Sequence, residues 1–457
     1  MSSASIRPSA PSALARFEAR IERSLRELPL VRASGAVTEI SMAHYRVAGL
    51  SRFLKLGDCV AVEDEERSQI GEVVKIDDVG ATLKPFDARC AATIGARAHR
   101  TKGLSLAPHP AWKGRVVDAL GRPIDGAGEL ARGEAAVAVD AEPPPALRRA
   151  RVAAPVKTGV RVVDLFTPLC LGQRIGVFAG SGVGKSSLLA MLARAPHFDT
   201  VVIALVGERG REAREFLDER LDKSRSAAVA VVATGDESAM MRRLAPKTAM
   251  AVAEYFRDRG ESVLLIVDSV TRYAHAARDV ALAAGEPAVA RGYAPSVFSD
   301  LPRLLERAGP GEEGSGTITA VFSVLVDGDD HNDPVADAIR GALDGHIVLD
   351  RAIADEGRHP AVNILSSISR LANTVWTAEQ RKLVANLRSL VARYEETRDL
   401  RLMGGYAPGA DAILDKAVKS APRIYEAMRQ SPDSPSCEDP FIELAAALRG
   451  DAKALEA

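Results

Sequence analysis

Seven residues, Gly180-Ser181-Gly182-Val183-Gly184-Lys185-Ser186, decide the fold of this chain. They stand between the apolar run 175–179, which is typical of a buried strand, and the stretch 187–193, which is helical by pattern. Glycines let a backbone fold tightly around a phosphate, and successive N–H groups at a helix start then face the anion. The context therefore predicts a phosphate-binding loop, or P-loop. Ala179 departs from the full motif, which has glycine there.

The P-loop predicts how a nucleoside triphosphate and its metal ion are held. Lys185 supplies positive charge near the β- and γ-phosphates, and the Ser186 hydroxyl is a candidate Mg²⁺ ligand. The residues expected to bind the phosphates are Gly180, Ser181, Gly182, Val183, Gly184, Lys185, Ser186 and Ser187.

Two carboxylates follow further apolar runs. Asp268 ends the run 263–267, and Glu208 follows the run 201–206 after Gly207. Ligands of open α/β sheets lie beyond the carboxyl ends of the strands, so we expect both carboxylates near the phosphates. Asp268 would contact Mg²⁺ and Glu208 would orient the attacking water. The alternatives are that Asp268 only caps a helix and that Glu208 belongs to a solvated charged surface.

The hydrophobic pattern places the P-loop in a mostly parallel sheet with helices on both faces. The predicted strands are 175–179, 201–206, 229–233, 263–267, 317–326 and 362–365. Short β-rich runs at 37–40, 59–62, 70–76 and 81–83 predict a small barrel before this sheet. Helical periodicity at 383–400 and 412–428 predicts a small α domain after it.

The predicted organisation is an α/β chain of four parts. Residues 1–30 form a flexible tail plus an amphipathic helix, and 31–100 form the β-barrel. Residues 101–376 form the nucleotide-binding domain, and 377–457 form the helical domain. The helix carries Leu14, Phe17, Ile21, Leu25 and Leu28 on one face. It either packs on its own domain or docks onto a partner protein or an anionic membrane surface.

Composition restricts the function further. The chain has 457 residues and a net charge of −1, with 60 basic and 61 acidic residues, so no nucleic-acid partner is expected. The cysteines at 59, 90, 170 and 437 are widely spaced, which predicts reduced thiols. The start lacks a secretory signal and no window could span a membrane, which predicts a cytosolic protein.

Further segments make the chain resemble the catalytic subunits of rotary ATP synthases and the related export ATPases. The turn 207–209, the strand 318–326 and the segment 360–370 carry this resemblance. The segments 178–186, 295–309 and 327–337 make the chain similar to the flagellar and type III secretion branch of that family. The resemblance implies a barrel, a RecA-like core and a helical domain, assembled as a homohexameric ATPase that uses ATP and Mg²⁺.

The resemblance also implies roles for single residues. Arg370 would be the arginine finger that reaches the γ-phosphate of a neighbouring subunit, and Arg209 belongs to the turn of the catalytic Glu208. His359 stands where relatives carry the Tyr or Phe that stacks on adenine, and imidazole offers less stacking area. Tyr406 lines the other side of the base pocket or packs within the helical domain. Asn363 stands where relatives often have Asp.

The implied function is ATP hydrolysis coupled to export of flagellar proteins at the inner face of the cell membrane. The implied partners are a stator-like regulator on the amphipathic helix, the export gate, export chaperones and their substrates. Two alternatives within the family are a virulence injectisome ATPase and the catalytic subunit of a proton-driven rotary synthase. A ring-shaped RNA motor would favour aromatic-rich strands, and aromatic residues make up only 4% of the chain. A non-catalytic scaffold is opposed by intact Lys185, Glu208, Asp268 and Arg370.

Overall fold

The computed structural model describes residue 14 and residues 33–64, 68–152, 154–326 and 333–449. Contacts divide the chain into two compact units, Met1–Pro85 with Arg89–Lys102 and Phe86–Ala88 with Gly103–Ala457. The tail and amphipathic helix predicted for residues 1–30 lie outside the described residues, apart from Leu14. The boundary predicted between residues 376 and 377 stays a prediction.

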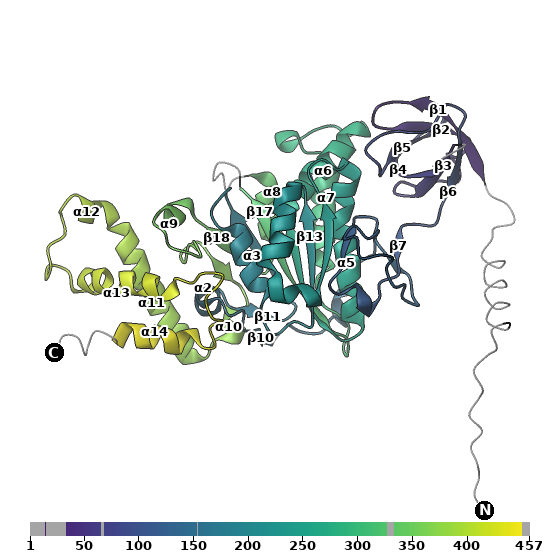
Figure 1. The fold of residues 1–457 in the computed structure, drawn as a ribbon. Coiled ribbons are helices and arrows are strands. Elements are labelled where there is room, and N and C mark those ends of the chain that lie inside the picture. The colour runs from purple at the N-terminus through teal and green to yellow at the C-terminus, as the bar shows by residue number, and fades with distance from the viewer. Residues whose placement is uncertain (1–13, 15–32, 65–67, 153, 327–332, 450–457) are drawn as a thin grey trace, which may run out of the picture. The chain divides into compact units, whose positions relative to one another are not determined.

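The first unit contains the predicted barrel (Figure 1). Its strands close in the order β1-β2-β5-β4-β3-β6, and every neighbouring pair is antiparallel. The inward side chains form one buried cluster that includes Val37, Tyr45 and Leu83. The sequence analysis missed β2 and β6, each only four residues long. The strands are β1 (Ser34–Ile40), β2 (Tyr45–Ala48), β3 (Cys59–Glu63), β4 (Ser68–Ile76), β5 (Ala81–Pro85) and β6 (Arg97–Arg100).

The second unit is built on the predicted, mostly parallel sheet. Its main path is β19-β18-β12-β17-β15-β13-β14-β8, in which only β19 runs antiparallel to its neighbour, and β16 pairs with β17 off the path. The strands are β8 (Val116–Asp118), β12 (Arg174–Ala179), β13 (Thr200–Val206), β14 (Ala228–Ala233), β15 (Ser262–Asp268), β16 (Gly309–Pro310), β17 (Thr317–Leu325), β18 (Gly345–Leu349) and β19 (Ile368–Ser369). Two-stranded pairs join β7 (Ser105–Leu106) to β9 (Val137–Ala138) and β10 (Pro155–Val156) to β11 (Leu169–Cys170).

Helices cover both faces of the sheet, as the unbroken burial of β13 and β14 requires (Figure 1). The face of Val201, Ile203 and Leu205 packs in one apolar cluster with α3. Helices α5 and α6 contact the sheet strands, and α7 packs on α6 and α8. The helices of this part are α2 (Arg161–Phe166), α3 (Lys185–Ala193), α4 (Gly210–Glu215), α5 (Ala239–Asp258), α6 (Val270–Ala283), α7 (Pro295–Glu306), α8 (Pro334–Ala342), α9 (Arg351–Asp355) and α10 (Ala372–Val375).

The strand predicted at 362–365 is wrong. Val362 makes only an isolated bridge to Leu349. Asn363 then folds the chain into a turn, because its side-chain oxygen accepts hydrogen bonds from the backbone N–H groups of Leu365 and Ser366 at 3.1 and 3.0 Å. The short strand β19 comes only after this turn. An apolar run was thus mistaken for a strand, since the side chain of Asn363 competes with sheet pairing.

Helices make up the end of the described chain, as predicted. Thr377 begins α11 (Ala378–Glu396) with a capping box to Gln380. The predicted helix 383–400 is interrupted at Thr397, which separates α11 from α12 (Arg398–Leu402). Helices α13 (Ala412–Met428) and α14 (Pro440–Arg449) follow, and α11, α13 and α14 all add side chains to the apolar cluster of α3. Among the described helices, none has the length and apolarity that crossing a membrane would need.

Candidate nucleotide site

The predicted P-loop joins β12 to α3, which begins at Lys185, two residues earlier than predicted. Gly182 and Gly184 have φ angles of 79° and 92°, a region that L side chains rarely adopt. Ala179 is still a strand residue, paired in parallel with Leu325 and Leu349. Extended backbone suits alanine as well as glycine, which explains why the motif tolerates this departure.

The sheet brings three charged side chains of the prediction together. Lys185 forms an ion pair with Asp268, and its Nζ lies 3.6 Å from Oε1 of Glu208. All three side chains are largely buried, with exposed fractions of 11%, 4% and 14% for Lys185, Asp268 and Glu208. They follow the carboxyl ends of three parallel strands of one sheet, β12, β15 and β13, with β17 between β12 and β15.

Two further contacts hold the carboxylates in place. The Ser323 hydroxyl donates a hydrogen bond of 2.7 Å to Oδ1 of Asp268. Nε of Arg272 lies 3.7 Å from Oε1 of Glu208. The Arg272 stem also packs against Gly207, where an added Cβ would lie 2.7 Å from Cδ of Arg272. Gly207 therefore allows the strand end to approach α6 closely.

Burial changes the acidity of Glu208. Desolvation raises its pKa above 4.5, the charge of Asp268 acts in the same direction, and the charges of Lys185 and Arg272 oppose them. Desolvation dominates because the side chain is mostly removed from water. A carboxylate poised in this way beside a phosphate-binding loop is suited to orienting water or exchanging a proton.

The P-loop opens into a cavity of about 600 Å³. Its lining is polar and carries both signs of charge. The lining residues are Gly180, Ser181, Gly182, Gly184, Lys185, Ser186, Ser187, Glu208, Arg209, Glu212, Arg272, Leu325 and Val326. Mg²⁺ prefers oxygen ligands and in such sites takes one or two from the protein and the rest from phosphate and water. The Ser186 hydroxyl and the nearby Asp268 carboxylate fit that requirement.

The two predicted catalytic arginines occupy different places. Arg209 lies in the cavity wall, with 80% of its side chain exposed and Nη1 3.7 Å from Oε1 of Glu212. Arg370 is exposed directly after β19, and its backbone N–H bonds the carbonyl of Asp344 at 2.9 Å. Arg370 is not among the described residues that line the cavity of its own chain. Its role stays a prediction.

The two residues predicted to contact the base are also separated. His359 lies beside the P-loop, since a Cβ added to Gly184 would be 3.7 Å from Nδ1 of His359. Tyr406 lies in the loop before α13, where its hydroxyl donates a hydrogen bond of 2.7 Å to Asp415. Its bonding partner lies within the helical region, which agrees with the packing alternative.

Sequence reasoning missed Arg272, Arg351 and Ser323. Arg351 donates a 3.0 Å hydrogen bond from Nη2 to the Ser181 carbonyl, although the two residues are 170 positions apart. No local sequence pattern predicts such a contact. Arg272 was easier to find, because it lies one helical turn after Asp268 at the start of α6.

Comparisons with known proteins agree with a nucleotide-binding fold of this kind. The model of the ATP synthase alpha/beta family, nucleotide-binding domain, matches residues 159–369, and that of the T3SS EscN ATPase C-terminal domain matches residues 376–446. The chain is 56% identical to a flagellum-specific ATP synthase of Agrobacterium fabrum, over 92% of this chain and 89% of that protein. It is 45% identical to the SPI-2 type 3 secretion system ATPase of Salmonella typhimurium, over 85% and 89%.

Solved structures give the same result. The assembled ATPase EscN of the enteropathogenic E. coli type III secretion system matches with a TM-score of 0.82 and 39% identity, over 91% of this chain and 99% of that chain. EscN in complex with its central stalk EscO matches with a TM-score of 0.81. This chain therefore belongs to the ATP synthase alpha/beta family, in the group of flagellum-specific ATP synthases and type III secretion ATPases.

Proposed function

We propose that this chain hydrolyses ATP to drive the export of flagellar proteins through a flagellar type III secretion apparatus. The observation that carries the hydrolysis is the meeting of Lys185, Asp268 and Glu208 beside a P-loop. The flagellar assignment is supported by relatives: two flagellum-specific ATP synthases are 56% and 55% identical, over 92% and 96% of the chain.

In this proposal, each site residue has its own role in ATP hydrolysis. Lys185 binds the β- and γ-phosphates together with the N–H groups of the loop, and Ser186 and Asp268 hold Mg²⁺. Glu208 orients the attacking water, and its contact with Arg272 keeps the carboxylate in one position. Arg209, exposed in the cavity wall, stabilises the negative charge of the transferred phosphoryl group. Mg²⁺, when bound, would neutralise part of that charge.

The active assembly is a homohexameric ring. An assembled form is described for the relative EscN, which is 39% identical to this chain. Arg370 is exposed and is not among the described residues that line the cavity of its own chain, which suits an arginine supplied to a neighbour. One chain carries both Glu208 and Arg370, so identical subunits can complete every site of a closed ring.

The partners follow from the same assignment. EscN is described in complex with a central stalk, EscO, and a comparable stalk-like protein would bind this ring. A stator-like regulator would bind the predicted amphipathic helix of residues 1–30. The chain would work in the cytoplasm, peripheral to the cell membrane, with the export gate, export chaperones and their substrates as further partners.

A virulence injectisome is the second candidate. Its support is the match of residues 376–446 to the EscN C-terminal domain and the 41–45% identity to type 3 secretion ATPases. The catalytic subunit of a proton-driven synthase is a further alternative, which predicts that the chain co-purifies with a distinct partner subunit of similar size.

A deletion strain separates these candidates. We expect loss of filaments and of secreted filament protein, both restored by the wild-type chain and not by Glu208→Gln. Normal filaments together with lost secretion of virulence proteins would move the assignment to the injectisome.

A further inference from the structure

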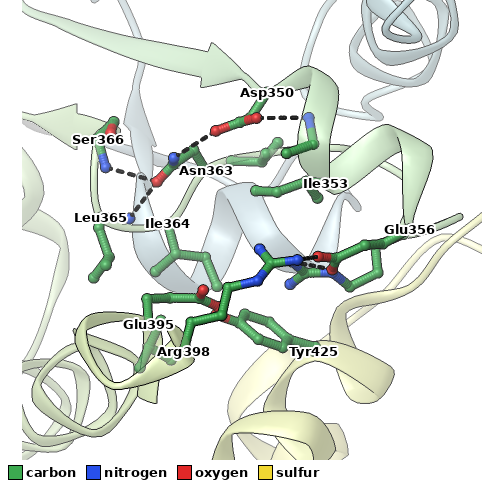
Figure 2. A pocket seen from close by; sticks show the side chains of 14 residues that line it. Asp350, Ile353, Glu356, Asn363, Ile364, Leu365, Ser366, Glu395, Arg398 and Tyr425 are labelled. Carbon is green, nitrogen blue, oxygen red and sulfur yellow. Dashed lines mark hydrogen bonds and ion pairs between the residues drawn. The ribbon is translucent and has the colours of Figure 1, made fainter. Parts of the chain in front are cut away.

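A second cavity is lined by Glu356 and Arg358, which shortly precede His359 in the chain (Figure 2). It measures about 240 Å³ and is bounded by α9, by the turn at Asn363 and by the helices α11 and α13. Side chains that line a cavity have no packing contacts on the side that faces it. Glu356 and Arg358 line this cavity, so their specific side-chain contacts matter more for their position.

The first of these contacts involves Arg358. Its guanidinium carbon lies 3.9 Å from the ring centre of Tyr425 on α13, and its Nη2 lies 2.6 Å from Oε2 of Glu356. Glu356 is bound in turn by Arg398 of α12 at 2.8 Å, as Figure 2 shows. The Tyr425 hydroxyl donates a hydrogen bond to Glu395. A guanidinium this close to an aromatic ring and kept largely from water makes a strong cation–π contact.

The second contact involves His359 itself. Its carbonyl accepts a hydrogen bond of 2.8 Å from the backbone N–H of Gln430, just beyond the end of α13. Gln430 is buried, and its side chain bonds Gly159 and Arg161 at 2.8 and 3.0 Å. Residues 358 and 359 are thus both attached to the end of α13, one through a side chain and one through its backbone.

We propose that Tyr425 is a positioning residue for the nucleotide base, acting through Arg358 to hold His359 beside the P-loop. The inference rests on the proposed role of His359 as the residue that meets the base. Tyr425 does not line the P-loop cavity among the described residues, so it acts without touching the phosphates. Its removal lets the segment relax toward the cavity of 240 Å³ and moves the imidazole away from the base.

The test compares ligands with and without a base. With Tyr425→Ala, we expect the KM for Mg·ATP and the Kd for ADP to rise about tenfold, the loss expected for one desolvated cation–π contact, with kcat kept within about twofold. The inhibition constant of inorganic tripolyphosphate, which has no base, should stay unchanged. Tyr425→Phe keeps the ring and should restore the KM. Lys419→Ala, an exposed change on the same helix, is the matched control.

A second substitution guards against misfolding of the first. Arg358→Lys keeps the positive charge but lacks the planar guanidinium that contacts the Tyr425 ring. It should therefore raise the KM for ATP, while the thermal unfolding temperature remains that of the wild type. Equal weakening of ATP and tripolyphosphate binding in either variant would mean general disturbance of the site and would overturn the proposal. A fall in kcat at unchanged KM would overturn it as well.

His359→Ala separates this inference from the proposal on which it rests. If His359→Ala raises the KM for ATP and Tyr425→Ala does not, the positioning role of Tyr425 is wrong while the base site stands. If neither variant changes the KM, the base is bound elsewhere and both statements fail.

Discussion

Lys185 and Asp268, 83 residues apart in the chain, form an ion pair at the carboxyl edge of the central sheet. The same ammonium lies 3.6 Å from Glu208, so one cation stands between two buried carboxylates. Lone buried charges are costly, and here each charge has an opposite neighbour. The residues proposed to bind phosphate, metal and water are thereby held together by electrostatics as well as by the fold.

Removing this cation should stop hydrolysis. With Lys185→Ala we expect ATP turnover to fall about a hundredfold or more, because one stabilising donor to the transferred phosphate is lost. Buried Asp268 also loses its counter-charge and Glu208 keeps only that of Arg272, so the unfolding temperature should fall. Steady-state phosphate release and thermal unfolding measure the two effects. Lys382→Ala, an exposed change on α11, is the control and should leave both values unchanged. Wild-type turnover by Lys185→Ala would refute its assigned role.

The raised pKa of Glu208 predicts how the ATPase activity depends on pH. Because burial raises this pKa above 4.5, the carboxyl takes up its proton at a higher pH than an exposed glutamate does. If the ionised form orients water, kcat/KM falls as the pH drops through that raised pKa and is full above it. The pH profile of kcat/KM should therefore show an acid limb above pH 4.5.

Glu208→Gln removes the group that titrates. We expect nucleotide binding to persist and kcat to fall by about 10² to 10⁴, with the acid limb lost from the residual activity. Equilibrium binding of ADP, measured beside turnover, separates the two effects. An unchanged acid limb in this variant would assign the titration to another group.

The sequence predicts features that are encoded in a few consecutive residues. It does not predict contacts between segments that only the fold brings together. The P-loop and the strand ends with Asp268 and Glu208 are each encoded within a few residues. The contact of Arg351 with Ser181 and that of Ser323 with Asp268 join segments far apart, so no pattern shows them. The strand predicted at 362–365 was wrong because apolar runs are typical of strands. The turn found there depends on the side chain of Asn363.

The position of Arg370 predicts complementation between subunits. Arg370→Ala should lower turnover by about 10³-fold or more, as loss of an arginine finger does. If the finger acts on a neighbour, mixed rings of Arg370→Ala and Glu208→Gln subunits contain some intact sites, formed by Glu208 of one subunit and Arg370 of the next. Mixing the two inactive proteins and allowing exchange should therefore restore measurable ATPase activity. Failure to restore any activity, in rings shown to be mixed, would place Arg370 in its own subunit's site.

Stability should depend strongly on one buried ion pair. Arg307 is 2% exposed and donates to Glu254 through Nε and Nη2 at 3.0 and 2.7 Å. Glu254→Ala leaves the guanidinium buried and unpaired, so the free energy of unfolding should fall by about 3–5 kcal/mol. Asp218→Ala breaks exposed pairs with Arg214 on α4 and with Arg225 and should cost about 0–1 kcal/mol. Denaturant unfolding compares the two, and equal small losses would contradict the importance of burial.

The most direct measurement is a structure of the assembled chain with Mg²⁺ and a non-hydrolysable ATP analogue. The account predicts the triphosphate against residues 180–187, Mg²⁺ near Ser186 and Asp268, and the guanidinium of a neighbouring subunit's arginine 370 at the γ-phosphate. Analogue density at another place, or none at saturating concentration, would contradict it.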